Sequence, residues 1–174
     1  MMCVRFTLMP NNMPKTAAVR VLGLDPGFGR LGFGIIERVG REWEVVTAGT
    51  IETSPKHSFV RRLVTIHDEV TALIKKYKPV AAAVEELFFA KNVTTGINVA
   101  QARGVVILTL AQAKVPIKEL TPLEVKQALT GYGRAEKRQV EYMVGHLLKI
   151  KPGKRLKDDA YDALAIALAA AGGR

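Results

Sequence analysis

The stretch V-L-G-L-D-P-G-F-G-R-L-G-F-G-I-I, residues 21–36, decides the fold of this chain. An apolar run ends at Asp25, a glycine-rich turn follows, and a second apolar run begins at residue 31. Apolar runs separated by turn residues are typical of neighbouring buried strands. The pattern therefore predicts a strand over 19–25 and another over 31–39, with one carboxylate at the end of the first strand.

The segments that follow predict an α/β domain. Residues 43–51 have the pattern of a third strand, and Gly40-Arg41 is the expected hairpin turn before it. Next we expect a helix with Ser54 as N-cap and Pro55 at its first position, which ends at Lys78-Pro79. A strand over 80–85, a helix over 94–113 and a strand over 115–120 follow. The rest of the chain predicts a short helix after the capping box Thr121 to Glu124, a helix over 134–149, and a helix from about 157 to 171. This order predicts a five-stranded mixed sheet flanked by helices, with three antiparallel strands and then two more.

Length and composition fit one globular domain. The chain has 174 residues, of which 48% are hydrophobic, and its single cysteine, Cys3, excludes an internal disulfide framework. Its apolar runs are interrupted before the ~20 residues that a membrane-spanning helix needs, so we expect no membrane contact and a cytoplasmic location. We interpret residues 1–18 as an N-terminal extension, either disordered or an artefact of the start site, before a single domain over 19–174.

The charge of the chain suggests a polyanionic partner. The formal net charge is +10 and the pI is about 9.9, a balance often found in proteins that bind nucleic acid. Much of the excess lies in residues 111–157, where 11 Lys and Arg face 4 Glu and no Asp, a net of +7. Loose binding of anions without a nucleic-acid function is the alternative.

Four carboxylates are placed where they could meet. Asp25 ends the first strand and Glu85 ends the fourth, while Asp159 and Asp162 share one face of the last helix. If that helix packs on the sheet, all four lie together, and their repulsion would be costly without a cation. Ligands that are all oxygen suit Mg²⁺ or Mn²⁺, and two such ions about 4 Å apart can activate water and stabilise the leaving oxygen in phosphodiester cleavage.

The glycines around Asp25 admit a matching interpretation. Gly27, Gly29 and Gly32 would leave space for a phosphate backbone and its metals, and would permit a sharp turn into the second strand. The acids also have plainer explanations, namely Asp25 as an ordinary turn residue, Glu85 with Glu86 as a solvated strand end, and Asp158 with Asp159 as residues favoured at a helix N-terminus. Asp162 is harder to explain in this way because it lies within an otherwise apolar helix.

Six short motifs together resemble a known family. They are G-L-D-P-G (23–27), V-E-E-L-F-F-A-K-N (84–92), Q-A-R-G-V (101–105), V-K-Q-A-L-T-G-Y-G (125–133), A-E-K (135–137) and D-A-Y-D-A-L-A-I-A (159–167). In this order they resemble the RuvC family of bacterial Holliday junction resolvases, within the RNase H-like nuclease superfamily. The resemblance covers nearly all of the chain from Val19 onward and implies an RNase H-like fold.

The resemblance also implies roles for single residues. Asp25, Glu85, Asp159 and Asp162 occupy the family's four catalytic acid positions, the third of which is His in some members. The expected DNA contacts are Phe88, which would stack on an unpaired base at the junction centre, Phe89 as its support, Lys126 and Lys137 at family DNA-contacting positions, and Arg134 and Arg138 as companions that bind phosphate. We interpret Arg103 as structural or interfacial.

The implied function is a structure-selective endonuclease that makes paired symmetric nicks in junction strands of like polarity. Its cofactor would be two Mg²⁺ per active site, with Mn²⁺ as a substitute. A homodimer would match the two-fold symmetry of the junction, with the 94–113 helix either in the interface or, alternatively, in the core. The family also works with the RuvA–RuvB branch-migration complex. The alternatives are a junction-binding protein that does not cut, another RNase H-like nuclease, and an actin-like ATPase.

Overall fold

A five-stranded sheet forms the centre of the chain in the computed structural model, which describes residues 18–87, 93–150 and 156–172. The strands are β1 (Arg20–Asp25), β2 (Arg30–Val39), β3 (Glu42–Glu52), β4 (Ala81–Glu85) and β5 (Ile117–Leu120). They lie in the order β3-β2-β1-β4-β5. The first three pair in antiparallel fashion, whereas β4 is parallel to both β1 and β5. The predicted mixed sheet is therefore confirmed.

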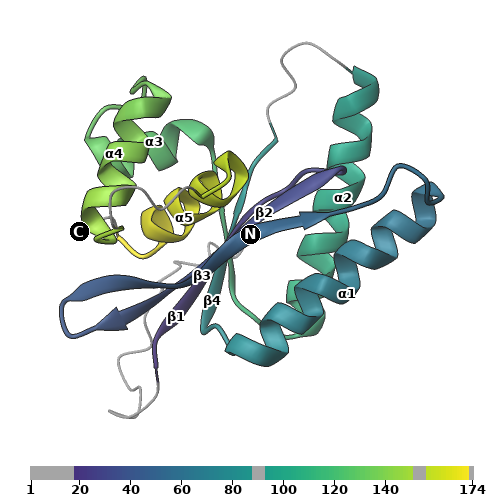
Figure 1. Cartoon of the computed structure of the whole chain (residues 1–174), viewed down its shortest axis with the longest axis horizontal. Helices are drawn as coiled ribbons and strands as arrows, with labels where there is room; N and C mark the ends of the chain where they lie inside the picture. The colour runs from purple at the N-terminus through teal and green to yellow at the C-terminus, as the bar shows by residue number, and fades with distance from the viewer. Residues whose placement is uncertain (1–17, 88–92, 151–155, 173–174) are drawn as a thin grey trace, which may run out of the picture.

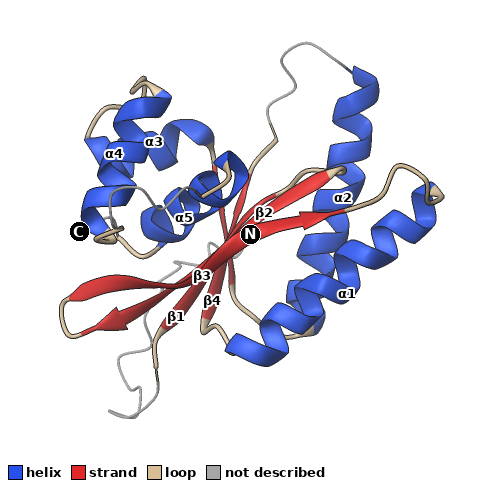
Figure 2. Ribbon diagram, viewed as in Figure 1, coloured by secondary structure: helices blue, strands red, loops and turns tan. Residues whose placement is uncertain are grey.

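Helices cover both faces of this sheet (Figure 1). On one side lie α1 (Phe59–Tyr77) and α2 (Val93–Gln112), and on the other lie α3 (Pro122–Thr130), α4 (Lys137–Leu147) and α5 (Asp158–Ala170) (Figure 2). Alternate residues of β1 serve the two cores, because Leu22 and Leu24 face α1 and α2 while Val21 faces α5. Among the described residues, no helix is both long and apolar enough to span a bilayer.

Helix α5 lies unusually close to the sheet because glycines remove the side chains beneath it. A Cβ at Gly32 would clash with the backbone carbonyl oxygen of Asp159, and one at Gly23 would clash with that of Ala163. The interpretation that Gly32 leaves room for a phosphate is therefore wrong, since the helix backbone fills that room. Gly27 does serve the predicted turn, because its missing Cβ faces the carbonyl oxygen of Arg30.

The boundaries of two helices differ from the prediction. Helix α1 begins four residues later than expected, since Ser58 is its N-cap and its hydroxyl accepts a hydrogen bond from the Arg61 amide at 3.3 Å. Ser54 instead opens a turn in which its carbonyl oxygen accepts from the His57 amide at 3.1 Å. Helix α4 begins at Lys137 rather than at 134, because Glu136 is its N-cap and forms a capping box with Gln139.

Other local predictions are confirmed. Gly40 adopts a positive φ of 64° in the hairpin between β2 and β3, as the turn requires. Thr121 and Glu124 form the predicted capping box at the start of α3. Lys78 ends α1 in the left-handed region, and its amide donates to the carbonyl oxygen of Ile74.

Candidate active site

Four carboxylates meet at one edge of the sheet. Strands β1 and β4 are parallel neighbours, so their last residues, Asp25 and Glu85, lie side by side at the same edge. Gly32 is the β2 partner of Asp25, and the backbone of Asp159 rests on this glycine. The close approach of α5 therefore sets Asp159 and Asp162 above Asp25, as the sequence predicted.

The electrostatics of the site show that the acids share one environment. Burial, followed by the charges of Asp162 and Asp159, raises the pKa of Asp25 to about 6, against a smaller opposing effect of Lys137. Burial, followed by the charges of Asp25 and Asp162, raises the pKa of Glu85 to about 7, and Lys126 opposes this shift. Removing a carboxylate from water while like charges lie nearby disfavours its ionised form. A bound cation would relieve this conflict.

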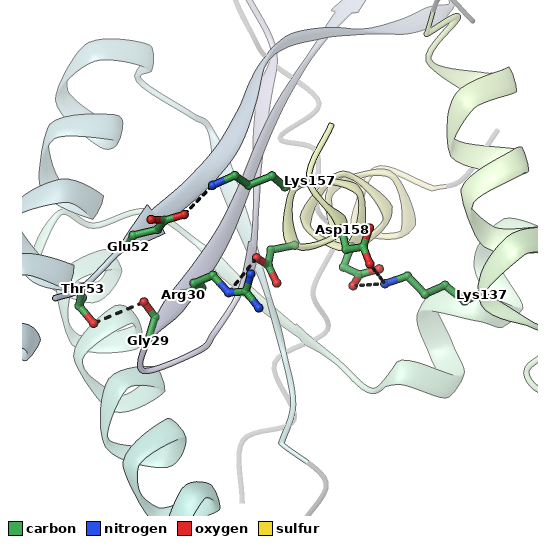
Figure 3. A network of polar contacts seen from close by, with 9 residues as sticks. Gly29, Arg30, Glu52, Thr53, Lys137, Lys157 and Asp158 are labelled. Atoms are coloured by element: carbon green, nitrogen blue, oxygen red, sulfur yellow. Dashed lines mark hydrogen bonds and ion pairs between the residues drawn. The ribbon is translucent and has the colours of Figure 1, made fainter. Parts of the chain in front are cut away.

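Basic side chains already approach the acids of α5. The Lys137 Nζ donates to Asp162 at 3.1 Å and lies 3.6 Å from the carboxylate of Asp158. Figure 3 shows Lys137 reaching toward Asp158. Partial burial alone would lower the pKa of Lys137, but the hydrogen bond and charge of Asp162, with Asp158, raise it overall. On the other side, the Nε of Arg30 lies 3.6 Å from the carboxylate of Asp159.

The donor set fits a hard divalent cation. All four side chains offer oxygen, which Mg²⁺ and Mn²⁺ prefer, and two of them are held on rigid strand ends. Within residues 18–87, 93–150 and 156–172, no three His, Cys, Asp or Glu side chains are arranged so that they could hold an ion together. Asp159 and Asp162 are instead paired with Arg30 and Lys137, so they would exchange these partners to share a metal with Asp25.

Two cavities adjoin the acids. The first, of about 240 Å³, lies between α3, α4 and α5 and contains Glu85, Asp162, Lys126 and Lys137 in its wall. The second, of about 500 Å³, lies at the start of α5 and is lined by Arg30, Lys137, Lys157, Asp158, Asp159 and Asp162. Lys137 lines both, so it stands between the two spaces.

The structure separates the predicted DNA contacts into three groups. It brings Lys126 and Lys137 to the acids, whereas Arg134 and Arg138 are exposed and line neither cavity described above. Phe88 and Phe89 lie outside the described residues. Two basic residues near the acids were not singled out from the sequence, namely Arg30 and Lys157.

Packing between elements explains why these two were missed. Arg30 closes the glycine turn in sequence, and it comes to lie beside Asp159 because α5 packs on β2 at Gly32. Lys157 was predicted only as the approximate start of the last helix, and in the structure it is the N-cap of α5. In the sequence, the one feature that could have pointed to them is distance along the chain from a candidate acid. Arg30 lies five residues after Asp25, and Lys157 lies two residues before Asp159.

Arg103 holds the end of β4 in place. Its Nε donates to the backbone carbonyl oxygen of Glu85 at 3.0 Å, and its guanidinium also pairs with the Glu119 carboxylate. Its side chain is only 19% exposed. This contact agrees with the structural interpretation of Arg103 and links helix α2 to the strand end that carries Glu85.

Helix α2 presents an apolar face to solvent. Ala102, Val106 and Leu110 are buried against the sheet and α1, whereas Ile97 is 50% and Leu108 is 56% exposed. The alternative that this helix is a central core helix is therefore wrong. The exposed side is the one available for the predicted contact between subunits.

Comparison with known proteins matches nearly the whole described chain to one family. The family model of RuvC, crossover junction endodeoxyribonuclease, matches residues 21–170. A crossover junction endodeoxyribonuclease RuvC of Roseiflexus sp. (strain RS-1) is 49% identical over 151 residues, which are 87% of this chain and 89% of the relative. The crossover junction endodeoxyribonuclease RuvC of Petrotoga mobilis is 46% identical over 147 residues, which are 84% of this chain and 90% of that relative.

A solved structure agrees in fold as well as in sequence. Thermus thermophilus RuvC in complex with a Holliday junction substrate superposes with a TM-score of 0.82 at 35% identity. The match covers 88% of this chain and 93% of that one. Because the superposition spans almost all of both chains, the arrangement of sheet and helices described above is that of the matched structure.

Proposed function

The chain belongs to the RuvC family of crossover junction endodeoxyribonucleases, and we propose that it resolves four-way DNA junctions by paired, symmetric nicks in strands of like polarity. It is an endodeoxyribonuclease by family, and the match to a RuvC bound to a Holliday junction supports this substrate. The observation that carries the proposal is that Asp25 and Glu85 end neighbouring parallel strands, close enough to Asp159 and Asp162 of α5 for their charges to influence one another.

In the proposed reaction a water molecule attacks phosphorus in line and the 3′ oxygen leaves, which yields a 5′-phosphate and a 3′-hydroxyl. Two Mg²⁺, or Mn²⁺ in their place, would supply an activated water and stabilise charge on the leaving oxygen. Asp25 and Glu85 would be the fixed ligands, because each ends a strand and is largely buried. Asp159 and Asp162 would complete the set by exchanging their present basic partners for metal.

The basic residues around the acids would hold the DNA backbone. Lys126 and Lys137 lie in the wall of the cavity beside Glu85, where each can pair with a phosphate near the cleaved bond. Arg134 and Arg138 would extend this contact along the exposed segment that leads into α4. Phe88 and Phe89 remain proposed contacts to unpaired bases at the junction centre.

Two cuts at symmetric positions call for two active sites related by a two-fold axis. A C2 homodimer would supply them, and the exposed apolar face of α2 around Ile97 and Leu108 supports a contact between copies there. From the family we also propose that the dimer works with the RuvA–RuvB branch-migration complex.

Cleavage of a labelled synthetic four-way junction tests this function. With Mg²⁺, we expect symmetric nicks in the junction and none in a linear duplex of the same sequence, and we expect Asp25→Asn to abolish nicking while junction binding survives. Asp68→Asn is the matched control, because this carboxylate is exposed on α1, on the face of the sheet opposite α5. Cutting that ignores junction structure, or that survives Asp25→Asn, would contradict the proposal.

A further inference from the structure

We infer that Arg30 and Lys157 form a second phosphate-binding position, which holds a backbone phosphate of the cut DNA strand on the β2–β3 side of the acids. This inference rests on the proposed nuclease function and adds to it a contact that lies opposite Lys126. The position is the cavity of about 500 Å³ at the start of α5. Its occupant is a phosphodiester of the DNA backbone, next to the one that is cut.

Three separate elements bring cations to this cavity. Arg30 is the first residue of β2, Lys157 is the N-cap of α5, and Lys137 is the first residue of α4. Figure 3 shows Arg30 and Lys157 approaching on the side of Glu52, while Lys137 reaches Asp158 on the other side. The cations therefore surround the acidic start of α5 rather than follow one strip of surface.

The present partners of these cations are easily exchanged. Lys157 and Arg30 are each 65% exposed, and their partners are Glu52 at 2.5 Å and Asp159 at 3.6 Å. Exposed ion pairs in water contribute little to folding stability, so exchanging a carboxylate for a phosphate costs the fold little. The hydrogen bond and charge of Lys157 lower the pKa of Glu52, so a phosphate that binds Lys157 would have to displace this carboxylate.

The chemistry of the wall favours a phosphate. Guanidinium and ammonium groups are the usual partners of DNA phosphates, and the cavity opens beside Asp159 and Asp162, which the proposed function assigns to the metal site. With three basic and three acidic side chains, the wall is close to neutral by itself. Divalent cations at the two aspartates would turn it positive, so binding of metal and binding of phosphate would support each other.

A purely structural role makes a different prediction. If the pair of Lys157 and Glu52 only tethers the start of α5 to β3, replacing either residue removes the same contact and both changes act in the same direction. If Lys157 binds phosphate and Glu52 competes with it, Lys157→Ala weakens junction binding whereas Glu52→Gln strengthens it. The sign of the second change therefore separates the two roles.

The chain contains a matched control pair. Lys149 and Glu42 also form a lysine–glutamate contact, between the turn after α4 and the start of β3, with side chains 65% and 55% exposed against 65% and 56% for Lys157 and Glu52. Glu42 begins β3, whereas Glu52 ends it, so the control pair lies at the other end of that strand. Lys149→Ala and Glu42→Gln thus change net charge equally without touching the cavity. Arg41→Ala, in the hairpin beside Glu42, is the control for Arg30→Ala.

The test is junction affinity measured against salt concentration in EDTA, which prevents metal-dependent cutting. Loss of one phosphate contact lowers the slope of log affinity against log salt by about 0.9. We expect that decrease for Lys157→Ala and for Arg30→Ala, an increase in affinity for Glu52→Gln, and smaller effects in all three control variants. Single-turnover nicking in Mg²⁺ should fall for Lys157→Ala and Arg30→Ala, and Lys157→Arg should restore it.

Two results would overturn the inference: equal effects at the Lys157 pair and the Lys149 pair, or weaker junction binding by Glu52→Gln. Failure of the proposed function looks different, because the unchanged protein would then leave the junction uncut in Mg²⁺. The binding measurement in EDTA still decides on Arg30 and Lys157 in that case.

Discussion

Asp25 and Glu85 are partly buried carboxylates whose charges repel each other and the aspartates of α5. Their pKa values, about 6 and about 7, lie above the ordinary values of 3.8 and 4.5 that the unfolded chain would have. A carboxylate that binds its proton more tightly in the folded state stabilises the fold at low pH. Its contribution is complete below the unfolded pKa and is lost as pH rises through the folded pKa.

Metal-free protein should therefore lose stability from these two groups as pH rises from about 4 to about 7. Thermal unfolding in EDTA, measured across this range for the unchanged protein and for Asp25→Asn, isolates the part that Asp25 contributes. We expect the unchanged protein to lose stability relative to Asp25→Asn as pH rises, and Mg²⁺ to reverse the loss at pH 8. A difference that moves the other way with pH would show that Asp25 is not in the repulsive cluster.

Arg103 is a positioning residue for Glu85. It donates to the Glu85 carbonyl oxygen and pairs with Glu119, so its loss would free the end of β4 without removing a ligand. Because small misplacements of catalytic groups are costly, Arg103→Ala should slow single-turnover nicking about 10- to 100-fold. It should also raise the Mg²⁺ concentration needed for half-maximal rate while junction affinity stays the same.

Two further variants show whether Arg103 acts through this contact. Arg103→Lys keeps the charge but loses the fork of donors, so it should recover only part of the rate. Glu119→Gln should shift the metal dependence in the same direction as Arg103→Ala. If Arg103→Ala needs the same Mg²⁺ concentration for half-maximal rate as the unchanged protein, Arg103 has a role in folding alone.

At the scale of elements, the approach of α5 to β1 and β2 makes the site. A methyl group at Gly32 would push against the backbone of Asp159, so Gly32→Ala should destabilise the protein by about 1–3 kcal/mol, as overpacking does. It should also lift Asp159 and Asp162 away from Asp25 and so reduce nicking. Denaturant unfolding and junction nicking check the two effects.

Gly145→Ala is the control for this change. A Cβ at Gly145 would meet open space within helix α4, so the substitution should stabilise the protein by up to about 1 kcal/mol through helix propensity. If Gly32→Ala and Gly145→Ala change the free energy of unfolding equally, α5 does not pack closely on β2 at Gly32.

Helix α2 should hold two copies together through its exposed face. Leu108→Asp places a charge on that face, and we expect it to convert dimers to monomers in sedimentation velocity without lowering the thermal stability of the monomer. Leu123→Asp, on α3 and similarly exposed at 58%, should leave the dimer intact. A protein that is monomeric before substitution, or a Leu108→Asp variant that stays dimeric, would contradict this interface.

Local patterns predicted elements well and contacts between elements less well. The hairpin at Gly40 and the capping box at Thr121 depend on neighbours in sequence, so both were predicted. Ser54 resembled an N-cap because Ser-Pro favours one. In the structure Ser54 opens a turn instead, and Ser58 after that turn is the N-cap of α1. The role of Gly32 was missed because it depends on a helix 127 residues later in the chain, from Gly32 to Asp159.

The candidate acids could be picked out from the sequence because most of them stand out in their own segments. Asp25 and Glu85 end apolar strands, and Asp162 lies within an apolar helix, so each is anomalous in its own segment. Arg30 and Lys157 are ordinary surface cations in theirs. They become neighbours of the acids because α5 packs on β2 beside Arg30 and begins directly after Lys157.

Across the whole molecule, an acidic centre is set in a basic protein. The net charge is +10, yet four carboxylates gather at one edge of the sheet, with Lys126 and Lys137 on one side and Arg30 and Lys157 on the other. Such a distribution attracts DNA over a wide surface and leaves the negative charge where metal would bind. In the proposed function, these basic side chains would guide a DNA backbone toward the acids from two sides.

The most direct test of the central claim is to locate bound metal. In crystals grown with Mn²⁺, an anomalous difference map should show density between Asp25, Glu85, Asp159 and Asp162, with the two aspartates of α5 turned away from Arg30 and Lys137. Density elsewhere, such as at Asp158 alone, or a map without density at the sheet edge at a Mn²⁺ concentration that supports nicking, would contradict the four-carboxylate site.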